Sequence, residues 1–289
     1  MAKHGLFVGL VTLDLIYLAD APPSSNQKIV AQATTIAAGG PATNAAIAFQ
    51  HLGGSATLLG AIGSHPICHL IQTDLQNWGV RVVDLDSSKT ESPPISSIVV
   101  TKSTGDRAVV SLNAVRSQLS PDCISPSILN DVDIVLIDGH QMQIGATIAK
   151  WASDRNIPVV IDAGSWKPGF DTLFPWVDYA ICSANFHPPT KQTVFDYLRS
   201  FGISNIAITQ GKHPIELSTL KIDVPQVSVI DTLGAGDIFH GAFCHYILEI
   251  LEQSILEQSF ASALDNAAKV AARSCQFFGT REWMKQPPI

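Results

Sequence analysis

Short apolar runs recur along the chain and alternate with segments whose apolar residues repeat at helical spacing. The runs, which are rich in β-branched residues and predict buried strands, are 6–11, 56–62, 133–138, 158–162, 178–182 and 205–209. Between them, helices are predicted at 41–54, 66–79, 143–156 and 189–201, the first two opened by proline and closed by glycine. This alternation predicts a mostly parallel sheet covered by helices on both faces.

Two stretches interrupt the alternation. Residues 26–35 mix polar and apolar positions, and 96–114 read as a hairpin that turns near Thr104, Gly105 and Asp106. We expect these regions to form a small side sheet of four antiparallel strands. The C-terminal residues 282–289 are expected to form an extended tail.

A further helix is predicted where "VIDTLGAGDIFHGAF", residues 229–243, passes from small residues into a helical apolar pattern. Helix N-termini offer unpaired backbone N–H groups and partial positive charge, and glycines let a phosphate approach them. A carboxylate at the same place suggests a second reactant, a hydroxyl that must lose its proton. A phosphate site and a proton acceptor at one helix N-terminus together indicate phosphoryl transfer to an alcohol. The same residues also fit a tight turn followed by an Asp helix cap.

Composition narrows the class of protein. The chain has 289 residues, 46% of them hydrophobic and 15% charged, which predicts one large core with modest extras. The net charge of −7 without a basic run argues against nucleic acid as a partner. Five scattered cysteines indicate a reducing compartment, and neither a signal-peptide pattern nor an apolar run of membrane-spanning length is found. We therefore expect a cytoplasmic protein without membrane contact.

Two motifs carry a resemblance to a known family. "DTLGAGDIFHGAF" is similar to the C-terminal signature of the ribokinase-like (PfkB) carbohydrate kinases, and "AAGGPATNAAIAFQHLGG" resembles their N-terminal signature. The likeness extends from Gly9 to about Gly279. It implies a single domain, 1–289, built as a three-layer α/β/α sandwich with a small β-sheet lid, whose strands are inserted at about 12–37 and 95–113. It also implies ATP-dependent phosphorylation of a sugar or sugar-like alcohol, with Mg²⁺.

The resemblance assigns roles to the C-terminal signature. Asp237 matches the catalytic base, and Gly234, Ala235 and Gly236 match the anion hole for the transferring phosphate. Asp231 is given a supporting role in shaping this loop. The family often binds a monovalent cation nearby, so such an ion is a further candidate cofactor.

The resemblance also assigns the acceptor side. Asp14, Gly39, Gly40 and Asn44 match the sugar-contact residues, and His140 follows a strand from which it could reach the sugar. An amide can both donate to and accept from a hydroxyl, which suits a polyol. Each residue also has a structural interpretation: a solvated strand end for Asp14, a helix cap for Asn44, and a hydrogen-bonded loop residue for His140.

The nucleotide side matches less well. Thr209 and Gly211, in "ITQGK", resemble the turn that lies against the nucleotide. Many family members carry N-x-x-E, which organises magnesium, but here the piece reads "ICSANFHPPT". Ser183 or Asn185 could replace the Asn, whereas Phe186 cannot replace a Glu. The protein ligands of the metal are therefore unknown.

Two other functions stay open. A nucleoside kinase of the same fold would need aromatic residues near the sugar site, and Phe7, Tyr17 and Phe49 are too few to argue for it. A non-catalytic sugar- or nucleotide-sensing module is the other alternative. The sequence does not name the sugar. The lid has edges and an apolar face that a second copy could cover, so a homodimer through the lid is expected.

Overall fold

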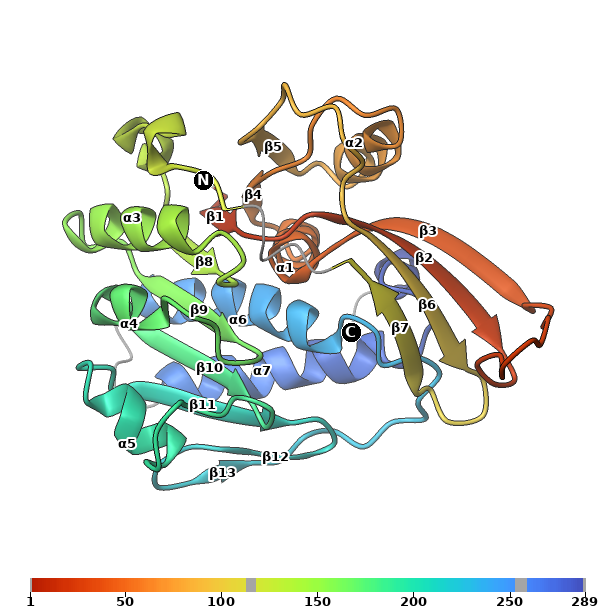
Figure 1. Cartoon of the computed structure of the whole chain (residues 1–289). Helices are drawn as coiled ribbons and strands as arrows, with labels where there is room; N and C mark the ends of the chain where they lie inside the picture. Colours follow the sequence, from red (N-terminus) through yellow and green to blue (C-terminus); the bar gives the residue numbers. More distant parts are fainter. Residues whose placement is uncertain (1, 113–117, 253–258, 288–289) are drawn as a thin grey trace.

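A nine-stranded sheet forms the centre of the molecule (Figure 1). The computed structural model describes residues 2–112, 118–252 and 259–287. The strand order is β13-β12-β11-β10-β9-β8-β1-β4-β5, parallel from β11 to β5, with β12 and β13 antiparallel to their neighbours. The strands are β1 (His4–Val8), β4 (Ser55–Gly60), β5 (Arg81–Asp84), β8 (Ile134–Ile137), β9 (Val159–Ala163), β10 (Tyr179–Ser183), β11 (Asn205–Gln210), β12 (His213–Glu216) and β13 (Lys221–Ile222).

Helices cover both faces of this sheet, as the alternating pattern predicts. One apolar core lies under α1 (Pro41–His51), α2 (Cys68–Asn77), α6 (Ala235–Glu252) and α7 (Ser259–Ser274). A second core lies under α3 (Met142–Ser153), α4 (Phe170–Leu173) and α5 (Val194–Arg199). Strands β8 and β9 are buried along their whole length because helices pack on both of their sides. The expected α/β/α sandwich is confirmed.

A separate four-stranded sheet, the lid, lies beside the main sheet (Figure 1). Its order is β3-β2-β6-β7, formed by β2 (Thr12–Ala19), β3 (Ala33–Gly39), β6 (Ile95–Thr101) and β7 (Arg107–Ser111). The hairpin turn between β6 and β7 contains Gly105, as predicted, with φ 71°. The expectation of antiparallel strands throughout is wrong, since β2 and β6 pair in parallel. Both strands leave the main body at the same end, Leu13 pairing with Ile95, so they run in the same direction.

The two faces of the lid differ in what they contact. Register places Ile16, Ile98 and Val109 on one face, and this face packs against Leu233 and Phe278. One pleat away, the row on the opposite face comprises Ile36, Leu15, Ser97 and Val110. We call the face with Ile16 the inward face of the lid and the face with Leu15 its outward face. At the base of the lid the outward face also packs on the first core through Leu13 and Leu15, and it is exposed at Ile36 and Val110.

Several element ends differ from the sequence prediction. Helix α5 begins at Val194 and not near 189, because prolines precede it and the Thr193 side chain caps it. The expected extended tail is wrong: the 3₁₀ helix η5 (Glu282–Lys285) buries Trp283 and Met284. The pattern also missed β5, β12, β13 and α7, together with the short 3₁₀ turns η2 (Pro121–Cys123), η3 (Pro126–Leu129) and η4 (Phe174–Trp176). Residues 113 and 114 of the predicted hairpin lie outside the described residues.

Candidate active site

The first turn of α6 presents an open backbone surface next to a carboxylate. Gly234 precedes the helix with φ 72°, a conformation that favours glycine. A Cβ atom at Gly236 would meet nothing within 4 Å, so the space above this residue is open. Asp237 lies in the same turn; the residue as a whole is half-buried, and its carboxyl group is turned toward Asn44. The geometry thus places free space, helix N–H groups and one acid together.

The loop before α6 is held by a buried carboxylate. Asp231 accepts hydrogen bonds from the backbone nitrogen atoms of Leu233 and Gly279, each at 2.8 Å. Burial raises the pKa of Asp231, and these two donors oppose the rise. Asp231 therefore joins the loop before α6 to the segment after α7, which is the kind of supporting role expected for it.

The carboxyl group of Asp237 is electrostatically unusual. Loss of solvent raises its pKa to about 7, and the negative charges of Asp162 and Asp14 act in the same direction. A hydrogen bond from Asn44 and the charge of His240 oppose the rise. A group of this kind can exchange a proton near neutral pH, which is the property required of a general base.

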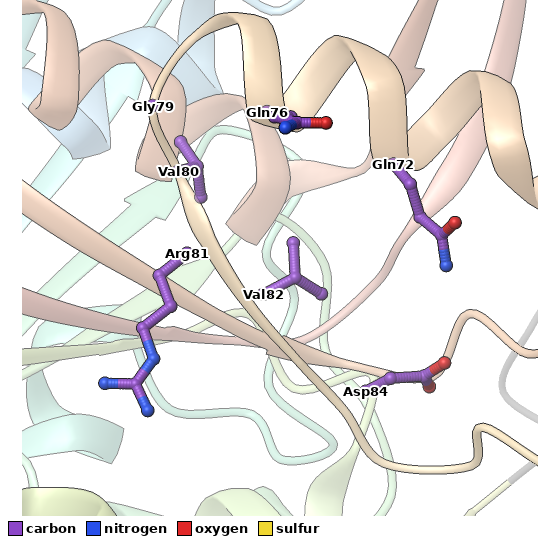
Figure 2. Close-up of a pocket in the computed structure, with 7 residues that line it drawn as sticks. All are labelled: Gln72, Gln76, Gly79, Val80, Arg81, Val82 and Asp84. Atoms are coloured by element: carbon purple, nitrogen blue, oxygen red, sulfur yellow. The ribbon is translucent and has the colours of Figure 1, made fainter.

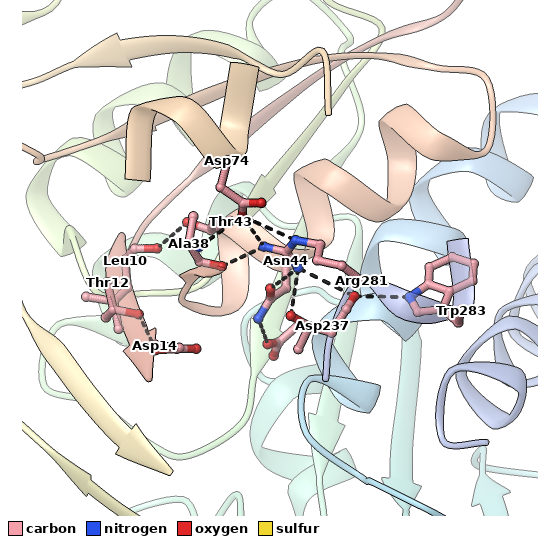
Figure 3. Close-up of polar contacts among 11 residues, drawn as sticks. Leu10, Thr12, Asp14, Ala38, Thr43, Asn44, Asp74, Asp237, Arg281 and Trp283 are labelled. Carbon is pink, nitrogen blue, oxygen red and sulfur yellow. Dashed lines mark hydrogen bonds and ion pairs between the residues drawn. The ribbon is translucent and has the colours of Figure 1, made fainter. Parts of the chain in front are cut away.

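The structure brings Asn44 to Asp237 from the N-terminal half of the chain. Helix α1 begins at Pro41, after Gly40 with φ 104°, and places Asn44 in its first turn. The Asn44 Nδ2 atom donates to Asp237 Oδ2 at 2.8 Å (Figure 3). The two family-like motifs therefore meet in one site, although 193 positions separate these residues.

Asp14 also belongs to this region. It lies on β2 with its carboxylate accepting a hydrogen bond from Thr12 Oγ1 at 2.8 Å (Figure 3). A Cβ atom at Gly39 would lie 2.0 Å from Asp14 Oδ2, so only glycine fits beside this carboxylate. Burial raises the pKa of Asp14, while its hydrogen bonds with Thr12 and Ser96 oppose the rise. The structure thus brings Asp14 and Gly39 together near Asn44 and Asp237, and the sugar contact of Asp14, Gly39, Gly40 and Asn44 stays a prediction.

His140 is held by a different acid. Its Nδ1 atom lies 3.1 Å from Asp138 Oδ1, and its backbone nitrogen donates to the same oxygen at 2.9 Å. Asp138 Oδ2 also accepts from the backbone nitrogen atoms of Leu10 and Ala42, at 2.9 and 3.2 Å. Although burial opposes it, the nearby positive charge of His140 and the backbone hydrogen bonds from Leu10 and His140 lower the pKa of Asp138 to about 2. The backbone of His140 is hydrogen-bonded, as expected of a loop residue, whereas its buried Nδ1 atom has no hydrogen-bond partner among the described residues. Its sugar contact stays a prediction.

Thr209 and Gly211 lie at the end of β11, apart from the contacts around Asp237. Thr209 Oγ1 donates to the Cys182 carbonyl oxygen at 3.2 Å. Gly211 is exposed, with φ 61°. Their contact with a nucleotide stays a prediction.

The departure from N-x-x-E has a clear structural consequence. Phe186 is fully buried and its ring packs beside Phe170 and Phe174. Ser183 Oγ donates to the Gly164 carbonyl oxygen at 2.7 Å, and Asn185 is exposed. Phe186, at the position where a Glu is usual, is therefore part of the second core and not of a metal site. In the described part of the chain, no three His, Cys, Asp or Glu side chains are grouped to hold a metal ion.

Sequence reasoning missed two residues of this site, Asp162 and Arg281. Asp162 is the penultimate residue of strand β9, its negative charge raises the pKa of Asp237, and its Oδ2 atom lies 3.6 Å from His240 Nδ1. Arg281 follows α7 and donates to Asn44 Oδ1 at 2.9 Å (Figure 3). An acid at the end of a predicted parallel strand was an available signal for Asp162. His240 was visible one turn beyond Asp237, whereas no pattern pointed to Arg281.

A surface hollow of about 500 Å³ lies elsewhere, between α2 and the edge strand β5 (Figure 2). Its lining includes Gln72, Gln76, Arg81 and Asp84. Asp84 is already used by the fold, since its carboxylate accepts from the backbone nitrogen atoms of Ile62 and Gly63 at 2.9 and 3.0 Å. None of the predicted site residues lines this hollow.

Comparison with known proteins identifies relatives over nearly the whole chain. The model of the pfkB family carbohydrate kinases matches residues 3–287. A ribokinase of Bacillus subtilis is 23% identical over 288 residues, covering 96% of this chain and 94% of that protein. The ribokinase structure from Giardia lamblia has a TM-score of 0.81 at 18% identity and covers 99% of this chain and 98% of that one. The structure of Arabidopsis thaliana ribokinase complexed with ribose and ATP has a TM-score of 0.73 at 20% identity, and the match covers 99% of this chain and 100% of that one.

Within the described ranges, no helix has the length and apolar character needed to cross a bilayer.

Proposed function

Because the chain belongs to the pfkB family of carbohydrate kinases, we propose that it transfers a phosphoryl group from ATP to a sugar hydroxyl at Asp237. One observation carries the assignment of this site. A carboxylate whose pKa is raised to about 7 lies in the first turn of α6, beside open space and in hydrogen-bond contact with Asn44. The acceptor is bound between this carboxylate and Asp14 on the lid.

On the acceptor side, Asp237 orients the hydroxyl and accepts its proton as the bond to phosphorus forms. The alcohol becomes acidic late in a loose transition state, so a carboxylate of moderate basicity suffices. Asp14, Gly39, Gly40 and Asn44 bind the other sugar hydroxyls. His140, in the loop after β8, also contacts the sugar. Closure of the lid excludes water and limits hydrolysis of the donor.

On the donor side, the backbone of Gly234, Ala235 and Gly236 receives the transferring phosphoryl group. The open space above Gly236 fits this use, because a side chain there would occupy the approach to the helix N–H groups. ATP supplies the phosphoryl group and Thr209 and Gly211 contact the nucleotide. The Arabidopsis thaliana relative is complexed with ribose and ATP, which supports this pairing of ligands.

Magnesium accompanies ATP in this proposal. Mg²⁺ commonly takes one or two carboxylates together with substrate phosphates, so a site without a cluster of three ligands still fits it. The ion neutralises charge on the phosphates. Phe186 excludes the usual Glu, and no protein ligand is assigned. A monovalent cation near the loop of Asp231 is a further proposed cofactor.

A nucleoside acceptor receives no support from the aromatic residues considered for it. Phe7 and Phe49 are fully buried in the first core. Tyr17 alternates with Ile16 on β2 and therefore lies on the outward face of the lid. None of these three rings is placed to stack on a base beside Asp14.

The Asp237→Asn variant tests the function. We expect the rate of ADP formation with a panel of sugars to fall about a hundred- to ten-thousandfold, the usual contribution of a general base. Sugar binding, measured by calorimetry or thermal shift, is expected to persist. Retained turnover in the variant would contradict the role of Asp237, and sugar binding without turnover in the wild type would favour the sensing alternative.

Two further assignments belong to the same proposal. The outward lid face carries Ile36 and Val110, which are 52% and 77% exposed, and the unpaired edges of β3 and β7 flank it. A second copy of the chain covers this apolar face and forms a homodimer. The five cysteines are unpaired, which supports a cytoplasmic location.

A further inference from the structure

The Asn44 amide lies between the Arg281 guanidinium and the Asp237 carboxylate and is hydrogen-bonded to both (Figure 3). Arg281 is 8% exposed and comes from the segment after α7. Its Nη1 atom donates to Asn44 Oδ1 and to Thr280 Oγ1, each at 2.9 Å. Its Nη2 and Nε atoms lie 3.2 and 3.3 Å from Asp74 Oδ2 on α2, and Nη2 also donates to the Ala38 carbonyl oxygen. One guanidinium thus joins α1, α2 and the end of the lid strand β3.

These contacts determine the orientation of the Asn44 amide. An arginine has only donors, so the amide must turn its oxygen toward Arg281. An ionised carboxylate has only acceptors, so the amide must turn its nitrogen toward Asp237. The two requirements agree, and Asn44 transmits the position of Arg281 to Asp237 through two hydrogen bonds of 2.9 and 2.8 Å.

We propose that Arg281 is a positioning residue for the phosphoryl transfer: it fixes the Asn44 amide so that Nδ2 holds the Asp237 carboxylate at the N-terminus of α6. This inference rests on the proposed function of Asp237. It adds that the C-terminal segment, which carries none of the family-like motifs, controls the base.

The same geometry restricts what Asn44 offers to the acceptor. Its oxygen accepts from Arg281 and one Nδ2 hydrogen goes to Asp237, so one N–H and one lone pair of the amide remain. A sugar hydroxyl can therefore meet at most one donor and one acceptor on Asn44, both in the orientation that Arg281 fixes.

The segment that carries Arg281 has other anchors. Gly279 donates through its backbone nitrogen to Asp231, and Trp283 Nε1 donates to the Thr280 carbonyl oxygen at 3.2 Å. Trp283 is 4% exposed and its ring packs against His51 at a centroid distance of 5.1 Å. Because these contacts do not involve the guanidinium, we expect the chain to fold when Arg281 is changed.

The test compares Arg281→Met with Arg281→Lys. In the methionine variant the Asn44 amide can rotate, and we expect kcat/KM for the sugar to fall about ten- to hundredfold, the range for losing a hydrogen bond to a charged group. The acid limb of its pH profile is expected to move to higher pH, because Asp237 loses a fixed donor. The lysine variant keeps the charge and loses the planar arrangement of donors, so it should show a smaller loss and a smaller shift.

The pH dependence of the reaction reflects all the charged groups that act on Asp237. These are Asp162 on β9, Asp14 on β2, His240 on α6 and Arg281 itself. Only the last is changed, and the lysine variant separates its charge from its geometry. A pH limb that is unchanged in the lysine variant would leave charge alone as the cause and would overturn the positioning role.

Two controls complete the experiment. Arg273→Met removes a positive charge from the end of α7, away from Asn44, and is expected to leave kcat/KM and the pH limb unchanged. Asp74→Asn weakens the ion pair and is expected to lower the Tm without moving the limb, because Arg281 keeps its bond to Asn44. A folded Arg281→Met protein with wild-type kinetics would overturn the proposal.

A readout without substrate separates this inference from the proposed function. The pKa of the Asp237 carboxyl group can be followed by carbon-13 NMR in the free protein. We expect it to rise in Arg281→Met and to rise less in Arg281→Lys. If the wild type phosphorylates no sugar and these shifts are still seen, the proposed function fails while the positioning role stands; unchanged shifts overturn the positioning role alone.

Discussion

At the scale of single residues, Asp237 should contribute to function at a cost in stability. Its pKa is about 7 in the folded protein against 3.8 for an unperturbed carboxyl group. Between these values the folded state holds a proton that the unfolded state has lost. Stability therefore falls as the pH rises through this window, and the loss is complete above pH 7.

Asp237→Asn should remove this loss. We expect the variant to exceed the wild type in Tm by about 2 °C or more at pH 8, with the difference shrinking as the pH falls toward 4. Thermal unfolding followed by circular dichroism at several pH values measures it. Asp154→Asn, at an exposed position, serves as the control and should show no such trend. A difference that is constant with pH would show that Asp237 is not desolvated as described.

Some residues of this site could be predicted from the sequence and others could not. Asp14, Asn44 and Asp237 stand in or beside recognisable motifs, and the structure gathers them. Arg281 is 237 positions from Asn44, and its role arises only when the C-terminal segment folds back over α1. A buried arginine has no local signature, because its partners are chosen by tertiary packing. The aromatic Trp283 was a missed sign that the predicted tail is anchored.

At the scale of elements, two glycines of α6 should respond in opposite ways to the same change. A Cβ atom at Gly236 meets open space, whereas one at Gly241 would lie 2.2 Å from the Ala45 carbonyl oxygen on α1. Gly236→Ala is expected to stabilise the protein by up to about 0.5–1 kcal/mol and to lower kcat, because the methyl group enters the phosphate space. Gly241→Ala is expected to destabilise by roughly 1–3 kcal/mol through overpacking.

Denaturant unfolding and steady-state kinetics on both variants check this contrast. Each glycine is the control for the other, since the helix and the substitution are the same. A Gly236→Ala protein with wild-type kcat would show that the phosphate does not lie above this turn. The sequence predicted the start of this helix but not the use of Gly241, because close approach to α1 depends on a helix pairing that periodicity does not specify.

Sheet elements show the same division between local and tertiary information. The parallel strands β8 to β11 were predicted because continuous apolar runs mark strands buried on both faces. The strands β12 and β13 were missed because they are short and lie at the edge, where burial is incomplete. The parallel pairing of β2 with β6 could not be inferred from the hairpin pattern, since it joins segments about 80 residues apart, as the register of Leu13 with Ile95 shows.

At the scale of the whole molecule, neighbouring residues of β7 should separate assembly from catalysis. Val110 lies on the outward face of the lid, whereas Val109 shares the inward face with Ile98. Val110→Lys places a charge in the proposed dimer interface, so the sedimentation coefficient should change from that of a dimer to that of a monomer. Val109→Lys should leave assembly intact and raise the KM for the sugar, because the inward face is the one that carries Asp14. A wild-type protein that sediments as a monomer up to tens of micromolar, or a Val109→Lys protein that alone dissociates, would refute this assignment of the two faces.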